Sequence, residues 1–334
     1  MSENQLYTIS SSPHIKAEDS IYKIMYTVYL ALVPAGLFAV YSFGFKALFI
    51  IVLCTVSCMF FEWTFRKLVG RDPALAFDGS AAVTGMLLAL NLPATIPWWI
   101  AIIGSMIAIV FAKQVFGGLG ANVFNPALIA RVFLLISWPV DMTHFPSPTP
   151  LFGAAVDVTT SATPLTAIKM KMLMSEPITD VVSGVSIKNL LMGMHGGSMG
   201  EISVIAILIG AAILFYKKYI TWHIPITYIV TVAVFAAILN SVDPTKHAPV
   251  LYHLLSGGLF LGAFFMATDM VTSPMTHKGM IIFGFGCGFL TILIRAFGTY
   301  PEGTSFAILL MNLVTPIIDM YTKPKKFGEV QSNA

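Results

Sequence analysis

The sequence predicts an all-α polytopic membrane protein with about ten transmembrane helices, each needing about 20 apolar residues. Of its 334 residues, 57% are hydrophobic and only 10% are charged, whereas soluble domains carry about 25% charged residues. The net charge is only +3 and no basic tract is present, so the composition gives no support for nucleic-acid binding.

Six apolar stretches are long enough, or nearly long enough, to cross a bilayer. They are roughly 24–43, 46–65, 96–115, 201–216, 220–240 and 278–297. Four others are shorter and are interrupted by glycine and proline: roughly 79–92, 126–138, 254–269 and 303–320. The order long, long, short, long, short occurs twice, which predicts a five-plus-five internal repeat.

An odd number of spans in each repeat means that the second copy is inverted relative to the first. Inverted repeats with interrupted helices are frequent in transport proteins, and their sites lie near the membrane midplane. Irregular backbone at that depth needs protein or a cavity around it, so we expect the four short helices to wall a central site. Packing helices that are merely tilted or kinked are the alternative.

Charge asymmetry sets the expected orientation. With the N-terminus in the cytoplasm, Lys and Arg residues on the cytoplasmic side outnumber those on the other side, as the positive-inside rule requires. Both termini are then cytoplasmic. The expected parts are a cytoplasmic N-terminal segment (1–20), the first repeat (21–139), an extracytoplasmic loop (140–200), the second repeat (201–320) and a cytoplasmic tail (321–334).

The long polar loop contains an unusual run, Asp157-Val158-Thr159-Thr160-Ser161-Ala162-Thr163. Small hydroxyl residues in loops are most often turn residues, so spacing alone favours an ordinary turn. The run nevertheless resembles the flavinylation motif D-x-x-(S/T)-G-A-(S/T), with Ser161 at the glycine position.

Three further stretches, at 77–85, 117–127 and 265–274, occur with this loop in the order found in one family. With it, they resemble the membrane proteins comprising the D subunit of the Rnf complex and the B subunit of the sodium-pumping NADH:quinone reductase. The likeness extends from Ser12 to about Gly328. The short polar N-terminal segment favours the Rnf branch.

The resemblance implies a multi-pass subunit, in the cytoplasmic membrane of a prokaryote, of a complex coupling ferredoxin:NAD electron transfer to Na⁺ or H⁺ export. Such a subunit is not catalytic alone. Its partners are the other subunits, membrane lipid and a flavin transferase, which joins FMN to Thr163 through the phosphate. A second, non-covalent flavin such as riboflavin is implied in the repeat cavity. The implied flavin-contacting residues are Asp157, Thr160, Ser161, Ala162, Asp78, Gly79, Ser80, Asn125 and Asp269.

Several of these residues also have purely structural readings. Asp78 and Asn125 precede short helices, where their side chains suit a capping role. Arg131 lies in an apolar helix and needs a carboxylate, phosphate or carbonyl partner. Glu62 and Asp319 are expected to be solvated caps near the cytoplasmic ends of spans. No histidine or cysteine spacing predicts a metal site.

Three other functions remain open on the sequence alone. The repeat by itself would suit a channel or secondary transporter of urea-transporter-like architecture. The B subunit of the quinone reductase is a second alternative, and an assembly subunit without a cofactor is a third. Covalent flavin on Thr163 would separate the channel and the assembly subunit from the main interpretation.

Overall fold

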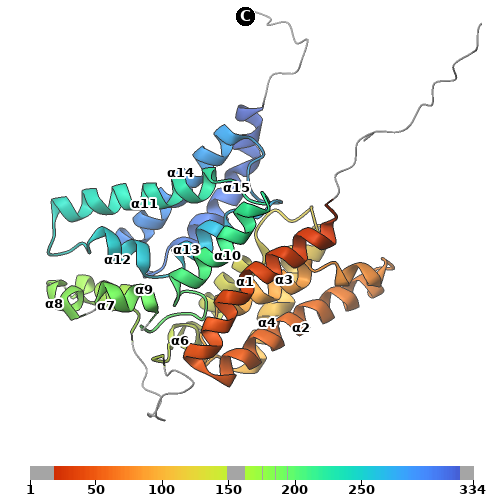
Figure 1. Cartoon of the computed structure of the whole chain (residues 1–334), viewed down its shortest axis with the longest axis horizontal. Helices are drawn as coiled ribbons and strands as arrows, with labels where there is room; N and C mark the ends of the chain where they lie inside the picture. The colour runs from red at the N-terminus through yellow and green to blue at the C-terminus, as the bar shows by residue number, and fades with distance from the viewer. Residues whose placement is uncertain (1–18, 149–161, 175, 185, 194, 324–334) are drawn as a thin grey trace, which may run out of the picture.

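The computed structural model describes residues 19–323 except 149–161, 175, 185 and 194, and within these ranges the chain is all-α, as predicted (Figure 1). Five helices are long and apolar enough to cross a membrane: α1 (Ile21–Phe43), α2 (Phe45–Leu68), α11 (His223–Val242), α14 (His277–Phe297) and α15 (Thr304–Thr322). The protein is therefore a multi-pass membrane protein.

Four shorter apolar segments accompany these spans: α3 (Ser80–Leu90), α4 (Trp98–Met106) continued by the π-helix η2 (Ile107–Gln114), α5 (Pro126–Ser137) and α10 (Val204–Tyr216). Three expected lengths were wrong. Stretch 96–115 was expected among the longer ones, but its helix, Trp98–Gln114, is one of the shorter segments. Stretch 303–320 forms a full span, because Pro316 lies inside α15 without ending it. Stretch 201–216 gives a helix of only 13 residues, because Ser203 caps its start by accepting a hydrogen bond from Ala206 N.

The third element of each half is interrupted at a glycine with positive φ. In the first half, the 3₁₀ turn η1 (Pro73–Phe77) leads to Gly79, with φ of 91°, immediately before α3. In the second half, α12 (Val250–Leu255) leads to Gly257, with φ of 74°. The chain then continues as α13 (Leu259–Leu261) and the π-helix η3 (Gly262–Met266). Positive φ strains most other residues, so these glycines fix both breaks.

The first helices of the two halves run antiparallel. Ile24 and Met25, at the start of α1, line the same cavity as Tyr219 and Ile220, just after α10. At the other end, the last turns of α1 share a groove with the first turn of α10. Corresponding helices also make corresponding contacts, because α2 packs on α3 and α4 while α11 packs on α12 and α14. These contacts are those of an inverted repeat.

The loop between the halves carries α6 (Pro139–Thr143), α7 (Pro164–Leu173), α8 (Thr179–Gly184) and α9 (Ile187–Met192). Helices α7 to α9 lie next to α12 (Figure 1). After α9, residues 195–203 are buried. There Met199 N and Gly200 N donate to the carbonyls of Leu92 and Leu90, at 3.1 and 2.6 Å. The loop is thereby joined to the end of α3.

Candidate functional site

A cavity lies where the start of α3 meets the segment after η3. Helix α1, the start of α5 and the end of α10 complete its walls, so both halves contribute. Its apolar lining includes Val28, Leu87 and Phe265, and its polar lining includes Ser80, Lys113, Asn122, Asn125 and Asp269. Of the residues predicted for this cavity, Ser80, Asn125 and Asp269 line it, whereas Asp78 and Gly79 do not.

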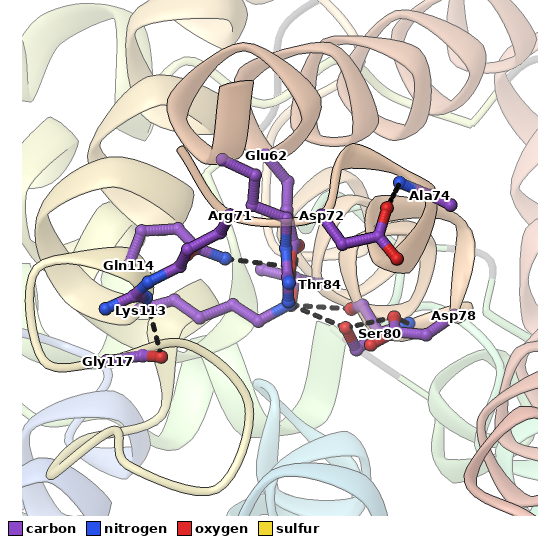
Figure 2. Close-up of polar contacts among 11 residues, drawn as sticks. Glu62, Arg71, Asp72, Ala74, Asp78, Ser80, Thr84, Lys113, Gln114 and Gly117 are labelled. Atoms are coloured by element: carbon purple, nitrogen blue, oxygen red, sulfur yellow. Dashed lines mark hydrogen bonds and ion pairs between the residues drawn. The ribbon is translucent and has the colours of Figure 1, made fainter. Parts of the chain in front are cut away.

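Lys113 is buried at the cavity wall and is the centre of a polar network (Figure 2). Its ammonium donates to Glu62 Oε2 and to Ser80 Oγ, each at 2.6 Å. Glu62 Oε1 accepts from Gln114 Nε2 at 2.8 Å and from Arg66 at 3.3 Å. The expectation that Glu62 is a solvated cap was wrong, since its side chain is fully buried between two cations.

Asp78 and Gly79 shape the start of α3. Asp78 Oδ1 accepts from Ser80 N at 2.7 Å and from Ser80 Oγ at 2.5 Å. The carboxylate thus has the capping role that the sequence left open, and Gly79 supplies the left-handed turn. Asp78 reaches the cavity only through Ser80, whose hydroxyl oxygen also accepts from the Lys113 ammonium.

Asn125 joins the two halves at the opposite wall. Its side-chain oxygen caps α5 by accepting from Ala127 N at 3.1 Å, as expected. Its amide donates to the carbonyl of Met266, at the end of η3, at 3.2 Å. Asp269 follows that end, and its Oδ2 accepts from Thr272 Oγ1 at 3.2 Å. Asn122 also lines the cavity, one turn before α5.

A second polar cluster occupies the pseudo-equivalent place, where the end of α3 meets the break before α13. Arg131 donates to Asn91 Oδ1 at 2.8 Å and to Glu201 Oε1 at 3.2 Å, and it also pairs with Glu302. Arg295 donates to the carbonyls of His253 and Ser256. Arg131 thus has the carboxylate partners that its position requires. The sequence analysis did not identify Glu201 and Glu302 as partners of Arg131. In the sequence, each is a single carboxylate next to a glycine beside an apolar span, and that was the one feature that could have marked it.

Thr163 forms the N-cap of α7 in the loop between the halves. Its backbone is extended, with φ of −63° and ψ of 152°, and its hydroxyl accepts from Thr166 N at 3.1 Å. The two threonine hydroxyls lie 2.7 Å apart. Thr163 is only 4% exposed, whereas Ala162 is exposed. Asp157, Thr160 and Ser161 lie outside the described residues.

Lys169 connects α7 to the membrane helices by hydrogen bonds. Its ammonium donates to the carbonyls of Arg295 and Ala296, at 3.2 and 3.3 Å, at the end of α14. A cation at a helix C-terminus is favoured by the helix dipole. Burial lowers the pKa of Lys169 from its usual value. Helix α7, whose N-cap is Thr163, is therefore held by contacts to a membrane span.

Comparison with known proteins adds independent information. The profile of the NQR2, RnfD, RnfE family matches residues 8–328. The chain is 45% identical to the D subunit of the proton-translocating ferredoxin:NAD(+) oxidoreductase complex of Clostridium ljungdahlii, over 98% of this chain and 97% of that protein. It is 46% identical to the D subunit of the Na(+)-translocating ferredoxin:NAD(+) oxidoreductase complex of Acetobacterium woodii, over 96% of this chain and 95% of that protein.

A third relative is the D subunit of the ion-translocating oxidoreductase complex of Stutzerimonas stutzeri, which is 41% identical over 92% of each chain. Both the family profile and these relatives cover the two halves, the cavity and the loop that carries Thr163. The chain therefore belongs to the NQR2, RnfD, RnfE family.

Proposed function

We propose that the chain is the flavin-carrying membrane subunit of an Rnf-type complex, which couples electron transfer between ferredoxin and NAD to ion export. The observation that carries the proposal is the run Asp157–Thr163 in a chain of this family. The names of the relatives from C. ljungdahlii and A. woodii describe components of such complexes. The chain works with other subunits and is not catalytic alone, since its sequence contains no NAD or ferredoxin motif.

The residues around Thr163 fit an attached FMN phosphate. The threonine hydroxyl stands at the N-terminus of a ten-residue helix, where backbone N–H groups and the helix dipole favour a negative phosphate. Thr166 N already donates to the Thr163 oxygen, so a phosphate attached at that oxygen would lie close to a backbone donor. A flavin held here supplies transfer of one or two electrons. Because a threonine hydroxyl is a poor nucleophile, a separate flavin transferase makes the bond.

Thr163→Val tests the attachment. When the wild-type chain is produced together with a flavin transferase, we expect flavin fluorescence that survives denaturing electrophoresis, and we expect Thr163→Val to abolish it. Thr166→Val is the matched control, because it removes a neighbouring hydroxyl but keeps the backbone N–H. Covalent flavin that persisted in Thr163→Val would move the attachment to Thr160 or Ser161.

The cavity between the two halves is the proposed place of a second, non-covalent flavin such as riboflavin. Its fit rests on the lining, which offers the amides of Asn122 and Asn125, the Lys113 ammonium and an apolar wall that includes Phe265. Lys113 donates hydrogen bonds to Glu62 and Ser80, and these bonds hold its ammonium group in position beside the cavity.

Asp269→Asn tests the role of this cavity. The substitution removes one negative charge and keeps the size of the side chain. We expect slower electron transfer or weaker ion coupling with normal assembly of the complex. Asp319→Asn is the matched control, since Asp319 caps Met275 N at 3.1 Å, away from the cavity lining. Normal ion pumping by a fully assembled Asp269→Asn complex would leave Asp269 a structural role only.

The proposed setting is the cytoplasmic membrane of a prokaryote, with lipid around the spans and both termini in the cytoplasm. The orientation rests on the excess of Lys and Arg on that side. It places α7 and Thr163 outside, where the flavin transferase would reach them. It also places the start of α1, and with it the cavity, in the cytoplasmic half.

A channel or secondary transporter is the second candidate, because antiparallel repeats with interrupted helices also occur in transporters. A channel has no need of flavin, so the Thr163 experiment separates the two candidates. The two relatives with nearly equal identity are named for different ions, H⁺ and Na⁺. Measuring ferredoxin-dependent transport in vesicles with and without Na⁺ identifies the ion for this chain.

A further inference from the structure

The two carboxylates of the second polar cluster share a single nitrogen of Arg131. Glu201 Oε1 accepts from Arg131 Nη2 at 3.2 Å, and Glu302 Oε2 pairs with the same nitrogen. The other terminal nitrogen of the guanidinium, Nη1, donates to Asn91 Oδ1. In the part of the chain that the structure describes, no other cation forms an ion pair with Glu201 or Glu302. One positive charge thus directly contacts two groups that can each be negative.

Other charged and titratable side chains surround the pair without forming an ion pair with it. Arg295 is close, because a Cβ built at Gly257 would lie 3.0 Å from Arg295 Nη2 and 3.7 Å from Glu302 Cγ. Its guanidinium, however, donates to the carbonyls of His253 and Ser256. The groups around the cluster are Arg131 on α5, Arg295 on α14, His253 on α12, Tyr228 on α11, His195 after α9 and Lys169 on α7. Arg131 is therefore the direct counter-charge of the pair.

Glu201 and Glu302 are also close enough to hydrogen-bond to each other. Ionised carboxylates are acceptors only, so a hydrogen bond between the two requires a proton on one of them. Two carboxylates that share a site also resist losing both protons, because their negative charges repel each other. Burial and the neighbouring Glu201 charge raise the pKa of Glu302 to about 8. The pair therefore holds one proton at neutral pH.

The pair has access to water on one side and close packing on the other. The Glu302 side chain, between α14 and α15, is 14% exposed, whereas that of Glu201 is 2% exposed. Beside Glu201, a Cβ built at Gly258 would lie 3.4 Å from Oε1 and 3.6 Å from Arg131 Nη1, so the backbone packs against the ion pair. A hard metal cation needs a shell of several oxygen ligands, whereas a proton needs no space of its own. The site therefore fits a proton, which reaches it through Glu302.

We propose that Glu201 and Glu302 form a proton-binding site, in which the two carboxylates share one proton and exchange it with the surrounding water through Glu302. With the proton bound, the pair and Arg131 together are neutral, and without it they carry one negative charge. The site lies at the end of α3, opposite to the cavity at the start of α3. Its use as an exit site for exported protons rests on the proposed function, whereas the binding of the proton does not.

The infrared band of a protonated carboxyl group tests the site in the purified full-length chain. In the wild type, we expect such a band at neutral pH that is lost as the pH rises past about 8. Glu302→Gln and Glu201→Gln should each remove this same band, because the remaining carboxylate then has Arg131 to itself and stays ionised. Glu176→Gln is the matched control, since Glu176 pairs with Lys171 on the exposed loop, and it should keep the band.

Two infrared outcomes would overturn the proposal. One is a wild-type spectrum with no carboxyl band that titrates in this range, a measurement that needs no variant and decides the matter even if a substitution prevents folding. The other is a band that one of the two substitutions leaves in place, because the carboxylates would then titrate independently.

The use of the site in export is tested in vesicles that contain the assembled complex. Ferredoxin:NAD electron transfer and proton export are measured together. Glu302→Gln cannot release a proton, so we expect proton export to be lost while electron transfer continues. Unchanged proton export by this variant, or wild-type export of Na⁺ without protons, would overturn the use of the site in export. A wild-type complex without ferredoxin-dependent ion export would overturn the proposed function and leave the infrared result standing.

Discussion

Glu62 shows how this membrane protein keeps charge in its interior. Its carboxylate is fully buried and pairs with both Lys113 and Arg66. Taking any of these groups out of water is unfavourable alone, and only mutual pairing with further hydrogen bonds offsets that cost. Ser80 and Gln114 supply those bonds. The start of α3 therefore depends on a carboxylate that belongs to α2.

Glu62→Gln is expected to destabilise the protein strongly. It leaves two buried cations without a counter-charge, and breaking a buried pair costs about 3–5 kcal/mol. The measurement is the thermal denaturation midpoint of the purified protein in detergent. Glu176→Gln is the matched control, because Glu176 pairs with Lys171 on the exposed loop, where an ion pair contributes little to stability. Equal midpoints for the two variants would contradict this account.

Residue roles were predictable where the interaction is local. The Asn125 cap follows from Asn-Pro at a helix start, and the need of Arg131 for a partner follows from its apolar surroundings. The identity of the partners was not predictable, since Glu201 and Glu302 lie 70 and 171 positions away in the chain. The error on Glu62 has the same origin, because Lys113 approaches it from 51 positions away.

Among the elements, α1 and α10 make an unusually close contact. A Cβ built at Gly210 would lie 1.9 Å from the carbonyl oxygen of Ala31, a backbone atom that cannot move without moving α1. Small residues allow helices in membranes to approach closely. The antiparallel contact between the first helices of the two halves thus depends on this glycine.

Gly210→Ala should weaken the contact between the two halves. Overpacking of this kind costs roughly 1–3 kcal/mol, and the backbone clash places it at the upper end. Thermal denaturation or the yield of folded protein by size-exclusion chromatography measures the effect. Gly184→Ala is the control, since nothing lies within 4 Å of that position at the end of α8. A Gly210→Ala protein as stable as the control would mean that α1 and α10 are separable.

At the element scale, the sequence predicted the order of helices better than their lengths. Hydropathy located α1, α2, α11 and α14 within a few residues. It failed for α10, where Met199 and Gly200, just before the predicted stretch, bond to the end of α3 and Ser203 caps the start of the helix. It also failed for α15, where neighbouring helices tolerate Pro316. Both failures come from tertiary contacts that a hydropathy window does not contain.

At the scale of the whole molecule, the charge asymmetry gives a testable topology. A reporter fused after Lys171, at the end of α7, should read as exported. A reporter fused after Lys326 should read as cytoplasmic. Alkaline phosphatase and green fluorescent protein fusions at the same two positions provide opposite readouts. The reverse pattern would contradict both the orientation and the route of flavin attachment.

The inverted repeat was the part of the whole molecule that the sequence predicted best, because an odd number of spans per half leaves no other arrangement. The repeat predicted that a cavity lies between the two halves, but it did not predict all of the residues that line it. Hydropathy placed Ser80, Asn125 and Asp269 near interrupted helices, but it gave no sign that Lys113 lines the cavity. The sequence did not predict that α7 packs against α14, because a polar loop has no hydrophobic periodicity from which its contacts could be inferred.

The two hydrogen bonds of Lys169 to the end of α14 have a mechanical consequence. They connect α7 to the end of a membrane span, so Thr163 is expected to move together with the end of α14. A flavin on Thr163 would then keep a constant separation from redox groups held by the same framework. Electron tunnelling falls off exponentially with that separation, so this lysine would govern the rate of electron transfer while leaving its driving force unchanged.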